Sequence, residues 1–149
     1  MRRKILVICS KVNPEICKKL YETAIEELKQ RGLRYKAVYV PGAFELPSAL
    51  NLLQADCFLG YVLLGCIIRS GTPHFDYVSS EACRGIMQVS LEKNLALGFG
   101  VITANNMEQA LERIVPYAKA AVAACVSMIN LKERSRSLFE EESCEDSDL

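Results

Sequence analysis

The sequence predicts an α/β fold, a three-layer α/β/α sandwich in which a four-stranded parallel sheet carries helices on both faces. Short apolar runs rich in β-branched residues alternate with longer segments whose apolar residues recur at helical spacing. One run, CFLGYVLLGCII, is apolar almost throughout, as expected of a strand covered on both faces. Repeated strand–helix units favour parallel strands joined by helical crossovers.

The first strand and the first helix are predicted at the start of the chain. Residues 4–10, KILVICS, form a short β-branched run typical of a buried strand. Residues 13–32 follow, with apolar side chains every three or four positions. Asn13 suits the N-cap, Pro14 suits the first helical position, and Gly32 suits the end of the helix.

The same alternation continues through the middle of the chain. Strands are predicted over 35–40, 57–68 and 95–103, and helices over 41–54 and 74–94. Pro41 and Gly42 break the second strand before its helix begins. Thr72 is expected to N-cap the third helix, with Pro73 at its first position.

The C-terminal third is predicted to be helical and then disordered. Residues 106–114 and 117–137 have helical spacing, and Pro116 is expected to separate them into two helices. The last eleven residues, 139–149, hold six acids and no base, a composition typical of a disordered tail. We therefore expect one domain over 1–138 and an acidic tail over 139–149.

Composition excludes several functional classes. No apolar run has membrane-spanning length, and the first one is too short for a secretory signal, so neither a membrane protein nor a secreted one is expected. Seven cysteines without a C-x-x-C pair suggest reduced, mostly buried thiols in a cytosolic protein. One histidine and scattered cysteines do not form a metal site. Without a basic stripe carrying aromatic residues, nucleic-acid binding is not expected.

The residues that follow the strands are candidates for a ligand site, because ligands of such sheets bind beyond the carboxyl ends of the strands. The segment RSGTPH, 69–74, offers backbone N–H groups to an anion at the start of a helix, although the same residues are equally typical of an ordinary helix start. Histidine titrates at about pH 6.5, so His74 is able to transfer protons, or it is an exposed histidine without a task.

Two further segments supply candidates of the same kind. In PGAFE, 41–45, the backbone of Ala43 and Phe44 and the carboxylate of Glu45 suit the hydroxyl groups of a sugar or polyol. Glu45 also favours the first turn of a helix electrostatically. Arg113 suits a phosphate group, but a solvated arginine on a helix face is the commoner case.

Four segments together resemble one family. They are ILVICSKVN (5–13), VPGAFELPSAL (40–50), GCIIRSGTPHFDYVSSEACRGI (65–86) and FGVITANNMEQALER (99–113). In order and spacing they resemble the 6,7-dimethyl-8-ribityllumazine synthase family over about residues 4–113. The family has a flavodoxin-like fold. It condenses 5-amino-6-(D-ribitylamino)uracil with 3,4-dihydroxy-2-butanone 4-phosphate, releasing phosphate and water in the penultimate step of riboflavin synthesis.

The resemblance implies a role for each matching residue and no metal or organic cofactor. His74 would handle protons, and Gly71 and Thr72 would bind the phosphate together with Arg113 of an adjacent subunit. The ribityl chain and the pyrimidine would contact Val12, Asn13, Ala43, Phe44, Glu45, Cys66, Ile67, Ile68 and, from a neighbouring chain, Phe99. The site between subunits implies a homo-oligomer.

The sequence departs from the family at three places. Val12 stands where the family usually has an aromatic residue. The segment after Arg113 lacks the usual glycine- and lysine-rich loop, and Lys119 is a candidate to replace its lysine. The chain also begins close to the first core strand. These departures favour a pentamer or a pair of pentamers over a capsid. They leave open an oligomer that binds flavin or lumazine with little catalysis.

Overall fold

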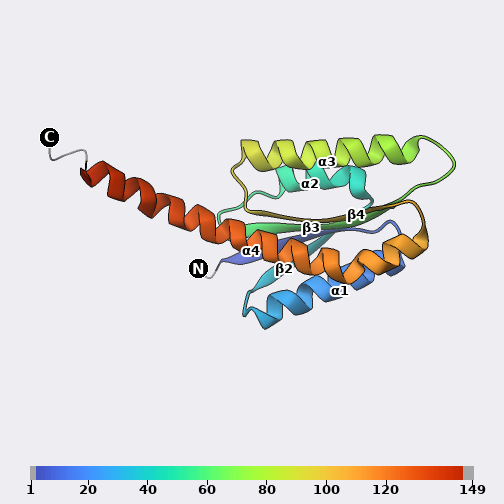
Figure 1. Ribbon diagram of the computed structural model, residues 1–149, viewed down its shortest axis with the longest axis horizontal. Coiled ribbons are helices and arrows are strands. Elements are labelled where there is room, and N and C mark those ends of the chain that lie inside the picture. Colours follow the sequence, from blue (N-terminus) through green and yellow to red (C-terminus); the bar gives the residue numbers. More distant parts are fainter. Residues whose placement is uncertain (1–2, 146–149) are drawn as a thin grey trace.

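The computed structural model describes residues 3–145, with side chains described for residues 3–140. A four-stranded parallel sheet in the order β2-β1-β3-β4 has helices on both faces (Figure 1). The strands are β1 (Lys4–Ser10), β2 (Tyr35–Val40), β3 (Phe58–Ile68) and β4 (Leu97–Ala104). The helices are α1 (Pro14–Gln30), the 3-10 turn η1 (Ala43–Glu45), α2 (Leu46–Leu52), α3 (His74–Glu92) and α4 (Met107–Glu145). The predicted three-layer sandwich is confirmed.

Successive side chains of a strand point to opposite faces of the sheet, so the core consists of two layers. Ile5 and Val7 of β1 lie in the cluster beneath α1 and α4, whereas Leu6 and Ile8 lie in the cluster beneath α2 and α3. Figure 1 shows these two helix pairs on opposite sides of the sheet. The central strands are therefore buried on both faces, as their continuous apolar runs predict.

Both ends of α1 lie where the sequence predicts them, but the predicted side-chain cap at the N-terminal end is absent. Gly32 has φ 68°, and its N–H donates to the Lys29 carbonyl while the Leu33 N–H donates to that of Leu28. This left-handed glycine ends the helix as predicted. Asn13 stands at the N-cap position, but its side chain forms no capping hydrogen bond.

Helix α3 begins at His74, where the predicted segment 74–94 begins, but its predicted cap is wrong by one residue. Pro73 occupies the N-cap and His74 is the first helical residue, so Thr72 does not cap the helix. A proline with its fixed φ is compatible with the N-cap, and the helix then begins without a side-chain cap. The hydroxyl group of Thr72 is thus left in the exposed loop before the helix.

The predicted break at Pro116 is also wrong, because α4 is one helix from Met107 to Glu145 with the proline inside it. Ile114 and Ala118, on either side of Pro116, are both buried against the sheet and α1. Packing of this face outweighs the backbone hydrogen bond that proline cannot donate. Helix α4 also includes residues 139–145 of the acidic tail, while residues 146–149 lie outside the described part of the chain.

By length and composition alone, the Met107–Glu140 part of α4 is long and apolar enough to cross a membrane. Core helices of globular proteins pass the same test. Here the apolar face of α4 packs on β4 and α1 through Ala118, Ala121, Val122 and Cys125. At Gly98 of β4 a Cβ atom would overlap the carbonyl oxygen of Ala121, so the helix lies directly on the strand. We therefore interpret α4 as a core helix.

Candidate functional site

The main candidate site is a crevice at the carboxyl ends of β1 and β3. From β1 the chain crosses to β2 on one side of β1, and from β2 it returns to β3 on the other side, so the strand order changes direction here. Sheets of this kind bind ligands at that point. The crevice measures about 730 Å³ and is lined by Val12, Asn13, Pro41, Gly42, Ala43, Phe44, Glu45, Cys66, Ile67, Ile68, His74, Tyr77, Val78 and Glu81.

The crevice brings together most of the candidates from four separate segments. Those in its lining are Val12, Asn13, Ala43, Phe44, Glu45, Cys66, Ile67, Ile68 and His74. Gly71 and Thr72 lie in the exposed loop that immediately precedes His74. The geometry therefore supports a common site for these residues, while their individual roles stay predictions.

Asn13 joins two strand ends at the floor of the crevice. Its backbone is left-handed, with φ 55° and ψ 64°. In this conformation its side-chain Nδ2 donates to the carbonyl oxygen of Cys66 at 3.1 Å, across from β1 to β3. Asparagine tolerates this backbone region better than most residues. The side chain thus holds the β1–α1 turn in place rather than capping the helix.

Gly42 brings a carboxylate and an apolar side chain close together. A Cβ atom at this position would lie 3.2 Å from Oε2 of Glu45 and 3.3 Å from Cγ2 of Val12. Val12 is 49% exposed and Phe44 is 61% exposed, although both are apolar. One wall therefore offers apolar surface for a ring and a carboxylate for hydroxyl groups.

The opposite wall is the first two turns of α3. His74, its first residue, lines the crevice together with Tyr77, Val78 and Glu81. These last three were not among the residues expected from the sequence. They follow His74 by three, four and seven residues, and this spacing places them on the same helix face. The spacing is visible in the sequence and would have been enough to predict them.

Arg69, which was not expected from the sequence either, holds the base of the loop that carries Gly71 and Thr72. Its Nε donates to Oδ1 of Asn105 at 3.1 Å, and its Nη1 lies 3.3 Å from Oδ1 of Asp76. Its guanidinium also stacks 4.4 Å from the ring centroid of Phe75. Exposed pairs of this kind add little stability, so we interpret Arg69 as positioning the loop.

Two buried thiols near the crevice, those of Cys66 and Cys9, are unsuited to nucleophilic chemistry. Burial, with a smaller contribution from the charge of Cys17, raises the pKa of Cys66 to about 12. A side-chain hydrogen bond with Cys17, followed by burial, raises the pKa of Cys9 above its ordinary value. Both thiols stay protonated at neutral pH, and a neutral thiol is a poor nucleophile. Cys66 contributes its backbone carbonyl to the site instead.

Three candidates lie away from the crevice within one chain. Phe99 is 41% exposed on the edge strand β4. Arg113 lies on α4, which covers the opposite face of the sheet, and its Nη1 donates to the Gln109 carbonyl at 3.1 Å. Lys119 forms a 3.7 Å ion pair with Glu27 of α1. A single chain therefore lacks these groups in its crevice.

Comparison with known proteins identifies the family of this chain. The family model for 6,7-dimethyl-8-ribityllumazine synthase matches residues 2–133. The enzyme of that name from Helicobacter acinonychis (strain Sheeba) is 46% identical over 114 residues, which is 74% of this chain and 73% of the relative. That of Protochlamydia amoebophila (strain UWE25) is 38% identical over 141 residues, covering 89% and 82%. That of Bartonella tribocorum is 36% identical over 142 residues, covering 90% and 94%. The chain therefore belongs to the 6,7-dimethyl-8-ribityllumazine synthase family.

Proposed function

We propose that this chain is a transferase that condenses 5-amino-6-(D-ribitylamino)uracil with 3,4-dihydroxy-2-butanone 4-phosphate to form 6,7-dimethyl-8-ribityllumazine, releasing phosphate and water. The observation that carries the proposal is the strand-end crevice of a chain in this family, where His74 and Glu45 line the same cavity. Holding two substrates side by side supplies much of the rate enhancement in such a condensation.

The crevice is proposed to bind the uracil substrate through its apolar and polar walls. The ring packs against Val12, Ile67 and Ile68, near the Cys66 backbone and Asn13. The ribityl chain lies toward Ala43, Phe44 and Glu45. The support for this arrangement is the close approach of Glu45 and Val12 on either side of Gly42. A carboxylate accepts hydrogen bonds from several hydroxyl groups at once.

His74 is proposed to transfer protons during imine formation and phosphate elimination. The phosphate binds at Gly71 and Thr72, in the loop immediately before His74. Donors in this position stabilise the negative charge that grows on the departing phosphate. The positioning of the loop by Arg69 supports this assignment.

Completion of the site is proposed to need a neighbouring subunit. Arg113 and Phe99 lie away from the crevice of their own chain, so we assign them to the crevice of an adjacent chain, as the family resemblance implies. Lys119 is not included, because Glu27 engages its ammonium group. The assembly proposed is a pentamer or a pair of pentamers.

No metal or organic cofactor takes part in the proposed reaction, and the proposed location is the cytoplasm. The six described cysteines, Cys9, Cys17, Cys57, Cys66, Cys83 and Cys125, are all free thiols. Free thiols persist in a reducing compartment.

A second candidate is an oligomer that binds flavin or lumazine with little catalysis. The observation that favours it is Val12, which offers a bound ring less contact area than an aromatic side chain. The purified chain, incubated with both substrates, should release phosphate and form the fluorescent lumazine in equal amounts. Tight riboflavin binding with no phosphate release would contradict the enzyme and support the binding protein.

A further inference from the structure

The turn between β4 and α4 lies beside the loop that is proposed to bind the phosphate. The backbone N–H of Arg69 donates to the carbonyl oxygen of Ala104, the last residue of β4, at 2.8 Å. The side chain of Arg69 reaches the next residue, because its Nε donates to Oδ1 of Asn105 at 3.1 Å. The residue that begins the loop is therefore joined to the end of β4 by both its backbone and its side chain.

Gln109, in the first turn of α4, holds Asn105 in place. Its Oε1 accepts the backbone N–H of Asn105 at 2.8 Å, so the side chain reaches back past the start of the helix. Its own N–H donates to Oδ1 of Asn106 at 2.9 Å. Gln109 is half-buried, and the next residue, Ala110, is fully buried in the core beneath α4. The glutamine is thus fixed to the core through its helix and to the β4–α4 turn through its side chain.

These hydrogen bonds form a continuous connection from α4 to the phosphate loop, residues 70–73. The connection runs from Gln109 to Asn105 and from Asn105 to Arg69. Nη1 of Arg69 also lies 3.3 Å from Oδ1 of Asp76, in the first turn of α3. The phosphate loop lies in the chain between Arg69 and α3, so the arginine supports both of its ends.

An ordinary helix start would need only part of this arrangement. Asn106 immediately precedes α4 and accepts the N–H of Gln109, which is the usual bond of an N-cap. In a capping box, the glutamine side chain returns to the N–H of the capping residue itself. Here it passes that residue and binds Asn105, whose side chain supports Arg69. The bond that departs from the capping box is the one that connects the helix to the phosphate loop.

We propose that Gln109 is a positioning residue that acts through Asn105 and Arg69 to fix the phosphate loop. This inference rests on the proposed function, in which the loop binds the phosphate of 3,4-dihydroxy-2-butanone 4-phosphate. Gln109 does not line the crevice of its own chain, so it acts there through other residues. Donors that are already in place bind the phosphate more tightly, because less of the loop has to be ordered on binding.

The same helix start lies close to a second group that is proposed to bind phosphate. Arg113 lies one helical turn further along α4, and its Nη1 donates to the carbonyl oxygen of Gln109 at 3.1 Å. This bond uses the backbone of Gln109, whereas the bond to Asn105 uses its side chain. A substitution of the Gln109 side chain should therefore disturb the phosphate loop of its own chain and leave the bond to Arg113 in place.

Gln109→Met tests the proposal, because methionine has similar length and helix propensity but no oxygen to accept the Asn105 N–H. Loss of this hydrogen bond should raise KM for the butanone phosphate about two- to tenfold. KM for the uracil substrate should stay the same. Calorimetric titration with inorganic phosphate should show a matching rise in Kd, and this measurement does not require turnover.

Double variants identify the residue through which Gln109 acts. Addition of Gln109→Met to Arg69→Ala should raise KM little further, because the support of the loop is already lost. Addition to Arg113→Ala should multiply the two single effects, because the two residues act independently. Independent effects of Gln109→Met and Arg69→Ala would overturn the proposal. So would an unchanged Kd for inorganic phosphate in Gln109→Met.

Two control variants separate positioning from helix capping. Gln30→Met makes the same substitution on the exposed face of α1, where it removes a bond to Glu26, and should leave both KM values unchanged. Asn106→Ala removes the cap of α4 but not the bond to Asn105. It should lower the melting temperature and leave KM for the butanone phosphate unchanged.

An equal rise of that KM in Asn106→Ala would mean that helix capping alone accounts for the effect, and would overturn the proposal. Failure of the proposed reaction has a different signature, which is the absence of lumazine formation by the wild-type chain.

Discussion

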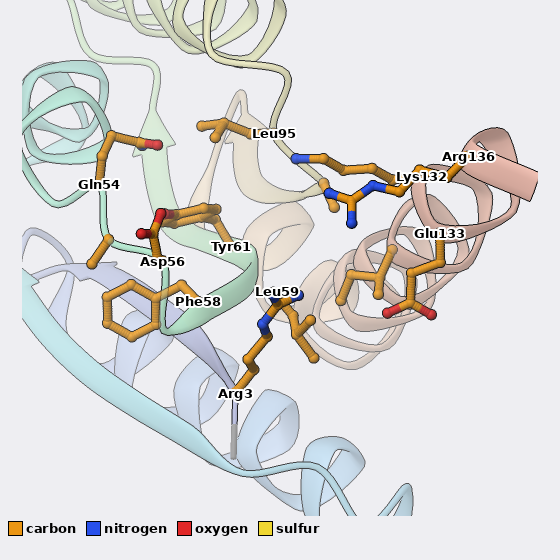
Figure 2. Close-up of a pocket in the computed structure, with 13 residues that line it drawn as sticks. Arg3, Gln54, Asp56, Phe58, Leu59, Tyr61, Leu95, Lys132, Glu133 and Arg136 are labelled. Carbon is orange, nitrogen blue, oxygen red and sulfur yellow. The ribbon is translucent and has the colours of Figure 1, made fainter. Parts of the chain in front are cut away.

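The two ends of the sheet carry cavities of different character. The carboxyl end has a crevice of about 730 Å³, built within the family-matched region from strand ends, η1 and α3. The amino end has a cavity of about 450 Å³ whose lining includes the cations Arg3, Lys132 and Arg136, the last of which lies beyond that region (Figure 2). Ligands of open α/β sheets bind beyond the carboxyl ends of the strands, and no such rule applies to the amino ends. We therefore expect substitutions at the first cavity to change turnover and substitutions at the second to change stability without changing turnover.

The largest expected effect is loss of catalysis in His74→Ala. Removal of a general acid–base group typically lowers the rate by about 10²–10⁴-fold. Particle mass and melting temperature should stay unchanged, because His74 is exposed at a helix start. Steady-state turnover and sedimentation measure the two properties. Unchanged turnover would remove His74 from the mechanism.

Arg69→Ala should have the next largest effect, through position rather than chemistry. Release of Asp76 and Asn105 frees the loop that carries the phosphate ligands, and misplacement of about 1 Å can cost up to about 10²-fold in rate. We expect a loss of about tenfold in kcat/KM, mostly as a higher KM for the butanone phosphate. Arg69→Lys should recover only part of the activity, since it cannot form both contacts. An equal loss of kcat with unchanged KM would argue against a positioning role.

Two substitutions at Asn13 separate its hydrogen bond from its backbone conformation. Asn13→Gly keeps the left-handed backbone but loses the bond to Cys66, and should cost about 1 kcal/mol of unfolding free energy. Asn13→Ala should cost about 1–2 kcal/mol more, because alanine is strained at this φ. Urea denaturation measures both. Equal costs would mean that the backbone conformation relaxes when the side chain is lost.

Val12→Phe should strengthen binding of the uracil substrate modestly. An aromatic ring in this exposed position offers a stacking surface worth about 0.5–1.5 kcal/mol, equivalent to roughly two- to tenfold in Kd. Calorimetric titration with the uracil substrate tests it, with Leu52→Phe on the exposed face of α2 as a control. Weaker binding would show that Phe has no room beside Gly42.

Lys132→Ala should have the smallest effect on the isolated subunit. It removes one exposed hydrogen bond to the Asn94 carbonyl, and we expect a loss of at most about 1 kcal/mol in stability with unchanged turnover. Chemical denaturation and steady-state kinetics measure the two quantities. A large fall in turnover would contradict the expectation that the two ends of the sheet have separate roles.

Much of the crevice could be predicted because its residues follow strands directly. A buried apolar run identifies a strand, and the fold then places the next residues at one edge, as happened for Asn13, Glu45 and His74. The opposite edge gave no such signal. Arg3, Asp56 and Lys132 meet there only because three distant segments are packed together, and no local pattern connects them.

The wrong predictions have the same physical origin. Pro116 and Thr72 were interpreted from local preferences for helix breaks and caps. The buried side chains of Ile114 and Ala118 keep α4 continuous across Pro116. Pro73, and not Thr72, occupies the N-cap position of α3. Local preferences amount to about 1–3 kcal/mol, which the packing of a long apolar helix face readily exceeds.

The position of His74 has a practical consequence for spectroscopy. It is the only histidine in the chain, and it lines the crevice from an exposed helix start. In a symmetric assembly, the imidazole C–H protons of the whole particle would therefore give one set of nuclear magnetic resonance signals, free of overlap with other histidines. Their chemical shifts would follow substrate, phosphate and product at the catalytic crevice without any label introduced by mutation.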